Sequence, residues 1–229
     1  MELSLRLKTI ASMVDKCEAV AEIGTDHGYI PIYLIKNNIC NTAIASDINL
    51  GPIEKAELNI SLENFSEKIE CRLGGGLTTI KPKEVNSAII AGMGGNLIRD
   101  IILESEEVFK NLDSAILQPV QNPEVLRRFI YEHGYCIVDE ELCFDQNKFY
   151  EIIKVSYDSE PREKEEIFYE VGEILINKKH PLIKEYLQYK TYKYNKIYEN
   201  IKEETEAAEI RKAEIKLKVK RLQELIQCI

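Results

Sequence analysis

The sequence predicts an α/β fold with a mostly parallel sheet in the first two thirds of the chain and a separate helical segment after it. Three observations support this prediction. Short apolar runs alternate with segments of helical spacing up to residue 132, a pair of strand-like runs follows, and glycine almost disappears after Pro161, where only Gly172 remains. Alternating strands and helices indicate βαβ units, whose strands run parallel.

Five short runs are predicted to form buried strands. Each is nearly continuous in apolar residues, as expected of strands that helices cover on both faces. The runs are AVAEI (19–23), AIASDI (43–48), IECRL (69–73), SAIIAG (87–92) and SAILQ (114–118). Right-handed crossovers between parallel strands are predicted to contain helices over residues 31–37, 52–64, 96–109 and 123–132.

The alternation ends at a predicted hairpin. Residues 135–158 contain two strand-like runs joined by the polar turn DQNK. We expect this antiparallel pair to extend the parallel sheet, which gives a sheet of seven strands.

The remaining segment is predicted to form two long helices packed as an antiparallel hairpin, after a shorter helix over residues 167–177. Thr205 is the expected N-cap of the last helix, because its hydroxyl can accept from a free amide. The predicted apolar face of the first long helix consists of Leu182, Tyr186, Tyr189, Lys193, Ile197 and Ile201. The four-three-four spacing of a coiled-coil seam is found at Ile215, Val219, Leu222 and Ile226.

The charge distribution suggests that these two parts are separate domains, 1–159 and 160–229. The 30 basic residues divide equally, 15 to each part, whereas the 39 acidic residues divide 25 and 14. The first part therefore has a net charge of −10 and the second of +1. An acidic first domain is not expected to attract nucleic acid by net charge, so any phosphate binding must use local basic clusters.

Several classes of protein are disfavoured by composition. The six cysteines include no C-x-x-C pair and the three histidines lie far apart in the sequence, so we expect no metal site. No run approaches the roughly 20 apolar residues of a membrane span, and the first residues do not resemble a secretory signal. We expect a cytoplasmic protein with no membrane segment and no obligate protein partner.

The first predicted strand ends in EIGTDHG (22–28), where Gly24 permits a sharp turn close to a ligand. In dinucleotide-binding folds this turn holds a pyrophosphate, but Asp26 is a poor neighbour for phosphate and a good one for a cation. S-adenosylmethionine, a nucleoside with a sulfonium and an ammonium group but no phosphate, fits better. The alternative is an ordinary strand-to-helix turn with Asp26 as a helix cap.

Special residues also follow the other four strands, at the sheet edge where open α/β sheets bind ligands. Asp47, beside Ile48, is placed to accept both ribose hydroxyls, Gly75 and Gly76 leave room for a flat ring, and Gln118-Pro119 follow the fifth strand. The fourth strand ends in Gly92, Met93 and Gly94, with Met93 a candidate for lining the pocket of the target base. The alternatives are that Asp47 is a solvated acid, that the glycines after the third strand form a flexible turn, and that those after the fourth strand serve close helix–strand packing.

The quoted motifs carry a resemblance to a known family. SLRL near the start, EIGTDHGYIP, SDINLGP, RLGGGL, IIAGMGG and ILQP are similar to those of the TrmK family, bacterial tRNA (adenine-N1)-methyltransferases that modify position 22. The resemblance extends over nearly the whole chain. It implies a Rossmann-like, seven-stranded methyltransferase domain and a C-terminal coiled-coil domain that helps to hold tRNA. It also implies S-adenosylmethionine as methyl donor, S-adenosylhomocysteine as product, and no metal.

The proposed reaction suggests roles for individual residues. Asp26 is the expected catalytic carboxylate, with His27 and Tyr29 positioning the base; the alternative is that Asp26 binds only the methionine amine of the cofactor. The expected tRNA-binding residues are Arg6, Met93, Gln118, Pro119, Lys190, Lys193 and Lys196. The lysines have the alternative of a solvated helix face. Three other functions stay open: a non-catalytic RNA-binding protein on a methyltransferase fold, a methyltransferase of another RNA base, and a Rossmann oxidoreductase.

Overall fold

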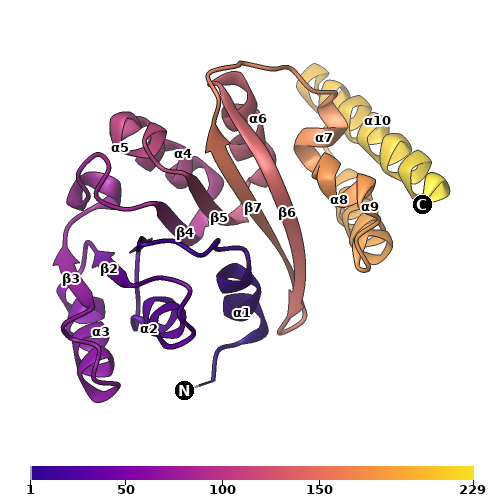
Figure 1. Ribbon diagram of the computed structural model, residues 1–229. Coiled ribbons are helices and arrows are strands. Elements are labelled where there is room, and N and C mark those ends of the chain that lie inside the picture. The colour runs from indigo at the N-terminus through magenta and orange to yellow at the C-terminus, as the bar shows by residue number, and fades with distance from the viewer. Residues whose placement is uncertain (1) are drawn as a thin grey trace. The chain divides into compact units, whose positions relative to one another are not determined.

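The computed structural model describes residues 2–229, and the contacts between them divide the chain into two units, Met1–Glu163 and Lys164–Ile229 (Figure 1). The boundary lies four residues beyond the domain limit expected from charge.

The first unit is built on a seven-stranded sheet in the order β3-β2-β1-β4-β5-β7-β6. Strands β1 to β5 are parallel, and β7 runs antiparallel to both β5 and β6. The predicted five parallel strands and appended hairpin are therefore confirmed. The strands are β1 (Ala19–Ile23), β2 (Thr42–Asp47), β3 (Ile69–Leu73), β4 (Ser87–Gly94), β5 (Ser114–Gln121), β6 (Tyr135–Asp145) and β7 (Lys148–Tyr157).

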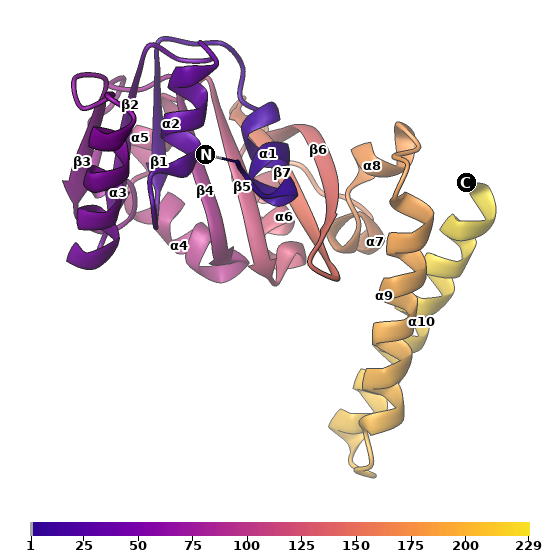
Figure 2. The ribbon, with the colours of Figure 1, turned by 90° about the horizontal axis from the view of Figure 1, so that it is seen from below.

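Helices cover both faces of this sheet. Figures 1 and 2 show α1, α2 and α3 on one face and α4 and α6 on the other. This explains why the central strands are apolar almost without interruption. The helices of the unit are α1 (Leu5–Ser12), α2 (Tyr29–Lys36), α3 (Leu50–Leu62), the 3-10 turn η1 (Gly76–Thr79), α4 (Gly95–Glu104), α5 (Glu106–Lys110) and α6 (Pro123–Glu132).

Two helices of this unit differ from the prediction. Helix α1 was not predicted; its N-cap is Ser4, whose hydroxyl accepts from the amide of Leu7 at 3.3 Å. The single helix predicted over residues 96–109 is wrong, because Ser105 leaves the helical conformation and separates α4 from α5. Glu106 and Glu107 then lie in the first turn of α5, where negative charge is favourable.

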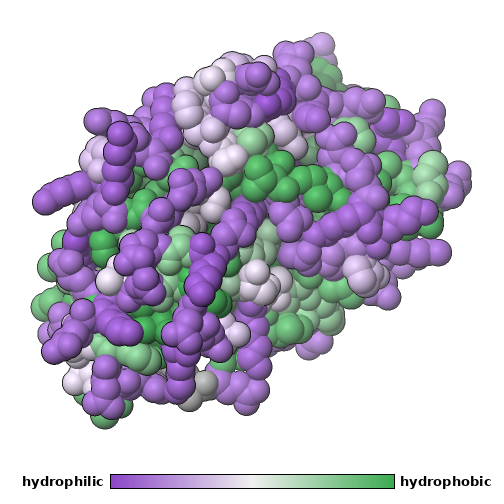
Figure 3. Space-filling model, in the orientation of Figure 1, coloured by the Kyte–Doolittle hydropathy of each residue, from purple (hydrophilic) through white to green (hydrophobic). Residues whose placement is uncertain are grey.

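The interior combines apolar packing with one buried ionic cluster. Hydrophilic residues cover most of the face shown in Figure 3, with apolar areas between them. Inside, Arg127 of α6 contacts Glu140 of β6 at 2.8 Å and Glu151 of β7 at 2.6 Å, and all three side chains are almost fully buried. Removing one member of such a cluster would leave buried charge uncompensated, which typically costs about 3–5 kcal/mol. The cluster therefore ties α6 to the hairpin.

The second unit consists of helices. It contains α7 (Glu166–Glu170), α8 (Glu173–Asn177), α9 (Ile183–Asn200) and α10 (Glu206–Cys228), of which α9 and α10 form an antiparallel pair (Figure 2). Thr205 caps α10 as predicted, accepting from the amide of Ala208 at 3.2 Å. The single helix predicted over residues 167–177 is wrong, because Val171 is extended and separates α7 from α8.

The predicted apolar face of α9 is wrong in part. Tyr189 and Ile197 are 40% and 36% exposed, whereas the buried residues of this helix are Ile183, Tyr186 and Leu187. On α10 the predicted positions Ile215 and Leu222 are buried. A seam of tyrosine and lysine has no clear apolar side, so spacing alone did not identify the face that α9 turns inward.

A buried acid explains that orientation of α9. Glu170 of α7 pairs with Lys190 and Tyr194 of α9 and with Lys218 of α10. Burial by itself raises the pKa of Glu170, but the two lysines and the tyrosine hold it below its ordinary value. The polar partners of Glu170 therefore turn towards the interior of the unit.

Candidate active site

The carboxyl ends of β1, β2, β3, β4 and β5 lie at one edge of the sheet, because these strands are parallel. The motif residues of the first unit follow these ends. Strand β4 runs on to Gly94, with register shifts against β5 around Met93. The glycine turns, Asp47 and Gln118 are thus brought to a common edge.

The turn after β1 is closed by contacts with β2 and β4. The amides of Gly24 and Thr25 donate to the carbonyl of Ser46 at 2.8 and 2.9 Å. Gly24 has φ +77°, and a Cβ atom there would lie only 2.2 Å from the terminal methyl of Met93. The positive φ favours glycine at this turn, whereas the contact with Met93 involves the end of a flexible side chain that can move.

A buried threonine completes this turn. The Thr25 hydroxyl donates to the carboxyl of Glu22 and accepts from the amide of Gly28 at 3.0 Å. Burial raises the pKa of Glu22 to about 7; the Thr25 bond and the charge of Arg6 oppose this shift, and the charge of Asp26 adds to it. Glu22 and Thr25 were not among the predicted site residues, because an acid in an apolar strand gives no signal by itself.

Asp26, His27 and Tyr29 form one cluster at the start of α2. The Asp26 side chain is 69% exposed, and its carboxylate lies 3.2 Å from Nε2 of His27 and 3.7 Å from Nζ of Lys55. The His27 ring stacks on Tyr29, with 4.8 Å between centroids and 11° between planes. The cluster offers an accessible carboxylate beside the His27 ring, which itself stacks on Tyr29, and Lys55 of α3 is a cation that the motif did not reveal.

Asp47 is oriented by the residue two positions later. Its Oδ1 accepts from the amide of Asn49 at 2.7 Å and from the side chain of Asn49 at 3.1 Å. Its carbonyl accepts from the amide of Gly74 at 2.9 Å, which links the end of β2 to the triple-glycine loop. Ile48 is 71% exposed and would be in van der Waals contact, at 3.5 Å, with a Cβ atom on Gly75. An oriented carboxylate and an exposed apolar side chain therefore lie beside this loop.

The end of β4 offers open backbone. Gly92 has φ +79°, whereas Gly94 has φ −68° and no atom within 4 Å of the place where a Cβ would lie. Gly76, in the loop after β3, has φ +55° and packs against Ile101. A flat or extended ligand can approach the main chain closely at Gly94.

Arg6 and Gln118, 112 positions apart, meet beside the end of β4. Nη1 of Arg6 donates to Oε1 of Gln118 at 2.8 Å, and Nε2 of Gln118 donates to the carbonyl of Pro119 at 2.9 Å. The Arg6 guanidinium lies over the ring of Tyr150, 5.5 Å from its centroid, and the Arg6 amide donates to Asp145 at 3.1 Å. Gln118 is fully buried, so its side-chain amide is held in place. Tyr150 and Asp145 of the hairpin were missed because nothing local indicates this contact.

The three predicted lysines of α9 have different surroundings. Lys190 is mostly buried and pairs with Glu170 at 3.7 Å. Lys193 lies over the ring of Tyr189 at 5.5 Å, and Lys196 over that of Tyr192 at 5.7 Å. Both of these tyrosines are exposed. Lys193 and Lys196 therefore belong to an aromatic and basic surface, and Lys190 belongs to the interior ionic contacts of the unit.

Residues 2–229 contain no group of three or more histidine, cysteine, aspartate or glutamate side chains arranged to hold a metal ion. Within the same residues, no helix has the length and apolar character needed to cross a membrane.

Comparison with known proteins relates this geometry to a family. A family model described as "Methyltransferase domain" matches residues 3–153. The tRNA (adenine(22)-N(1))-methyltransferase of Bacillus subtilis is 33% identical over 153 residues, a region that spans 67% of this chain and 64% of that enzyme.

Solved structures that resemble the whole chain include two proteins named TrmK. The B. subtilis m1A22 tRNA methyltransferase TrmK has a TM-score of 0.88 at 28% identity, covering 98% of this chain and 99% of that one. TrmK of M. capricolum, in complex with the cofactor product S-adenosylhomocysteine, has a TM-score of 0.83 at 27% identity, covering 99% of both chains.

Proposed function

The chain belongs to the TrmK family of class I, S-adenosylmethionine-dependent methyltransferases, and we propose that it methylates N1 of the adenine at position 22, in the D-arm of tRNA. The observation that carries this proposal is the meeting of the accessible Asp26 carboxylate, the oriented Asp47 carboxylate and the open Gly94 backbone at one edge of the sheet. Because its substrate is tRNA, we propose that the protein acts in the cytoplasm.

The residues at this edge fit an adenosine-containing sulfonium compound. The Asp47 carboxylate suits a ribose diol, as acids at the end of the second strand do in related folds. Ile48 offers an exposed apolar side chain, and Gly75 and Gly76 offer main chain without side chains, for an adenine ring. Gly24, Gly92, Met93 and Gly94 would border the amino-acid end and the sulfonium. The bound cofactor would supply the electrophilic methyl group.

The acceptor needs little activation, because N1 of neutral adenine carries its own lone pair. The main task of the protein is to hold that nitrogen in line with the methyl group, and such orientation supplies several kcal/mol in well-aligned reactions. Positive charge develops on the adenine as it is methylated. A nearby carboxylate stabilises such charge or accepts a proton from N6, and Asp26 is our candidate, with His27 and Tyr29 positioning the base.

The end of β5 is proposed to contact the edge of the same base. Gln118 and Pro119 lie at the end of β5, and Arg6 holds Oε1 of Gln118, so a fixed polar edge is available there. Met93 offers a flexible apolar surface between the cofactor and the base. The target base must leave the tRNA stack to reach this site, at a cost of a few kcal/mol.

We propose that residues 160–229 act as a coiled-coil domain that holds tRNA, and that residues 1–159 bind the cofactor. The exposed pairs of Lys193 with Tyr189 and of Lys196 with Tyr192 support this, because lysines bind phosphates and tyrosines stack on bases. Lys190 is expected to contribute indirectly, through its contact with Glu170.

The proposed activity is tested by methyl transfer to an unmodified tRNA transcript. We expect methyl groups from labelled S-adenosylmethionine to enter the wild-type transcript and not a transcript in which adenine 22 is replaced by guanine. Equal labelling of both transcripts would contradict the target, and labelling of neither would favour a non-catalytic RNA-binding protein. Binding of a nicotinamide cofactor in place of S-adenosylhomocysteine would favour an oxidoreductase.

A further inference from the structure

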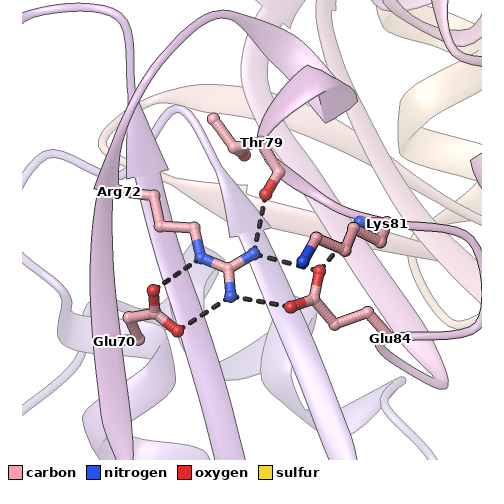
Figure 4. Close-up of polar contacts among 5 residues, drawn as sticks. All are labelled: Glu70, Arg72, Thr79, Lys81 and Glu84. Atoms are coloured by element: carbon pink, nitrogen blue, oxygen red, sulfur yellow. Dashed lines mark hydrogen bonds and ion pairs between the residues drawn. The ribbon is translucent and has the colours of Figure 1, made fainter.

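One arginine closes the loop that follows β3. From the strand, the guanidinium of Arg72 reaches across the loop to the carbonyl of Thr79 at 2.7 Å and to both carboxylate oxygens of Glu84 at 2.7 and 3.0 Å (Figure 4). It also makes two bonds to Glu70 on its own strand, at 2.9 and 2.8 Å. The start of the loop is thereby joined to its end.

Every N–H group of the Arg72 guanidinium donates a hydrogen bond. Its five N–H groups make five hydrogen bonds, with two carboxylates and one carbonyl as acceptors. Glu84 also accepts from the amide of Lys81 at 2.8 Å. The bond with Arg72 lowers the pKa of Glu84 to about 2, so the pair is charged throughout the physiological pH range. Two-pronged contacts of this kind fix orientation as well as distance.

The segment held by Arg72 is rich in glycine. It contains Gly74, Gly75 and Gly76, and glycine loses more conformational freedom on ordering than any other residue. The loop is nonetheless tightly folded, since a Cβ on Gly74 would lie 2.5 Å from a methyl of Thr79. The amide of Gly74 also donates to the carbonyl of Asp47. The loop and the carboxylate of Asp47 are therefore parts of one connected structure.

We propose that Arg72, with Glu84, is a positioning residue that preorganises the triple-glycine loop for the nucleoside half of the methyl donor. This proposal rests on the proposed function, because it assumes that an adenosine group binds at this loop. Arg72 does not touch the reacting atoms. Arg72 orders the loop when the protein folds, so the entropic cost of ordering the loop does not weaken ligand binding.

The test uses the full chain with Arg72→Gln and Glu84→Gln, and with Glu70→Gln as the matched control. The control also removes a carboxylate partner of Arg72, but one on the same strand, which does not span the loop. Affinity is measured by calorimetry for S-adenosylhomocysteine and for methylthioadenosine, which lacks the amino-acid end. Thermal unfolding shows whether each variant is folded, and the turnover number is measured at saturating methyl donor.

We expect Arg72→Gln and Glu84→Gln to weaken both ligands by the same factor, roughly tenfold, with the turnover number unchanged. Glu70→Gln should bind like the wild type. If Arg72→Gln does not fold, the ligand affinity of Glu84→Gln tests the proposal by itself. This variant keeps the shape of the side chain. Wild-type affinity in a folded Glu84→Gln variant would overturn the proposal, as would a loss confined to S-adenosylhomocysteine. A wild-type protein that binds neither ligand would instead overturn the proposed function itself.

Discussion

Replacement of Gly94 separates the effect of this residue on stability from its effect on ligand binding. Its φ of −68° suits any residue, and no atom lies within 4 Å of an added Cβ. Alanine is less favourable than glycine at the N-cap of α4 by a few tenths of a kcal/mol or more. Alanine also restricts the unfolded chain, which stabilises the folded protein by about 0.4–1 kcal/mol. The free energy of unfolding of Gly94→Ala should therefore change by less than about 1 kcal/mol.

The ligand should respond much more strongly. If the cofactor lies against the main chain at Gly94, the added methyl group intrudes into the contact, and such overpacking costs about 1–3 kcal/mol. That corresponds to a loss of affinity of about 5- to 150-fold. The assay is calorimetric titration of S-adenosylhomocysteine, together with denaturant unfolding.

Gly51 provides the matched control for this experiment. It lies in the first turn of α3, and again nothing lies within 4 Å of an added Cβ. Gly51→Ala should be neutral or stabilising by about 0.5–1 kcal/mol and should bind the ligand like the wild type. Wild-type affinity in Gly94→Ala would refute the argument that the end of β4 borders the cofactor.

Three further predictions concern charged side chains. Asp26→Asn should lower turnover at saturating S-adenosylmethionine more than it lowers affinity; unchanged turnover would remove Asp26 from the chemistry. The pKa of Glu22 in the folded protein is about 7, above its ordinary value of 4.5. Between these pH values the folded protein holds a proton that the unfolded chain has lost, so the free energy of unfolding falls as pH rises from 4.5 to 7. The free energy of unfolding of Glu22→Gln, relative to that of the wild type, should therefore rise by up to about 3 kcal/mol as pH increases from 4.5 to 8. Parallel pH profiles of the two proteins in denaturant titrations would contradict this. Glu170→Gln should lower the melting temperature of the second unit, because Lys190 and Lys218 lose a buried charge partner, while leaving calorimetric affinity for S-adenosylhomocysteine unchanged; a loss of that affinity would count against separate units.

The parts of the fold that the sequence predicts are those with local signals. The apolar run that stops at Gly24 shows both a strand and its end, and parallel strands bring such ends together without further information. Thr205 is another local case, because a cap acts on amides three residues away.

What was missed depends on contacts between distant residues. Arg6 reaches Gln118 because α1, which has no strong pattern, packs against the hairpin of β6 and β7. Gln118 itself was predicted, but not that Arg6 would hold its side chain. The inward face of α9 is similarly set by Glu170, which lies outside that helix. Periodicity records which side chains are apolar, and it contains no information on a buried acid in a neighbouring element.

The central claim is that the carboxyl edge of the sheet binds an adenosine sulfonium compound between Asp47, the triple-glycine loop and the end of β4. A crystal structure of the protein with S-adenosylhomocysteine tests it most directly. We predict the ribose hydroxyls within hydrogen-bond distance of Asp47 and the adenine ring beside Gly75 and Ile48. Density for the ligand at another place, or none at saturating concentration, would contradict the account.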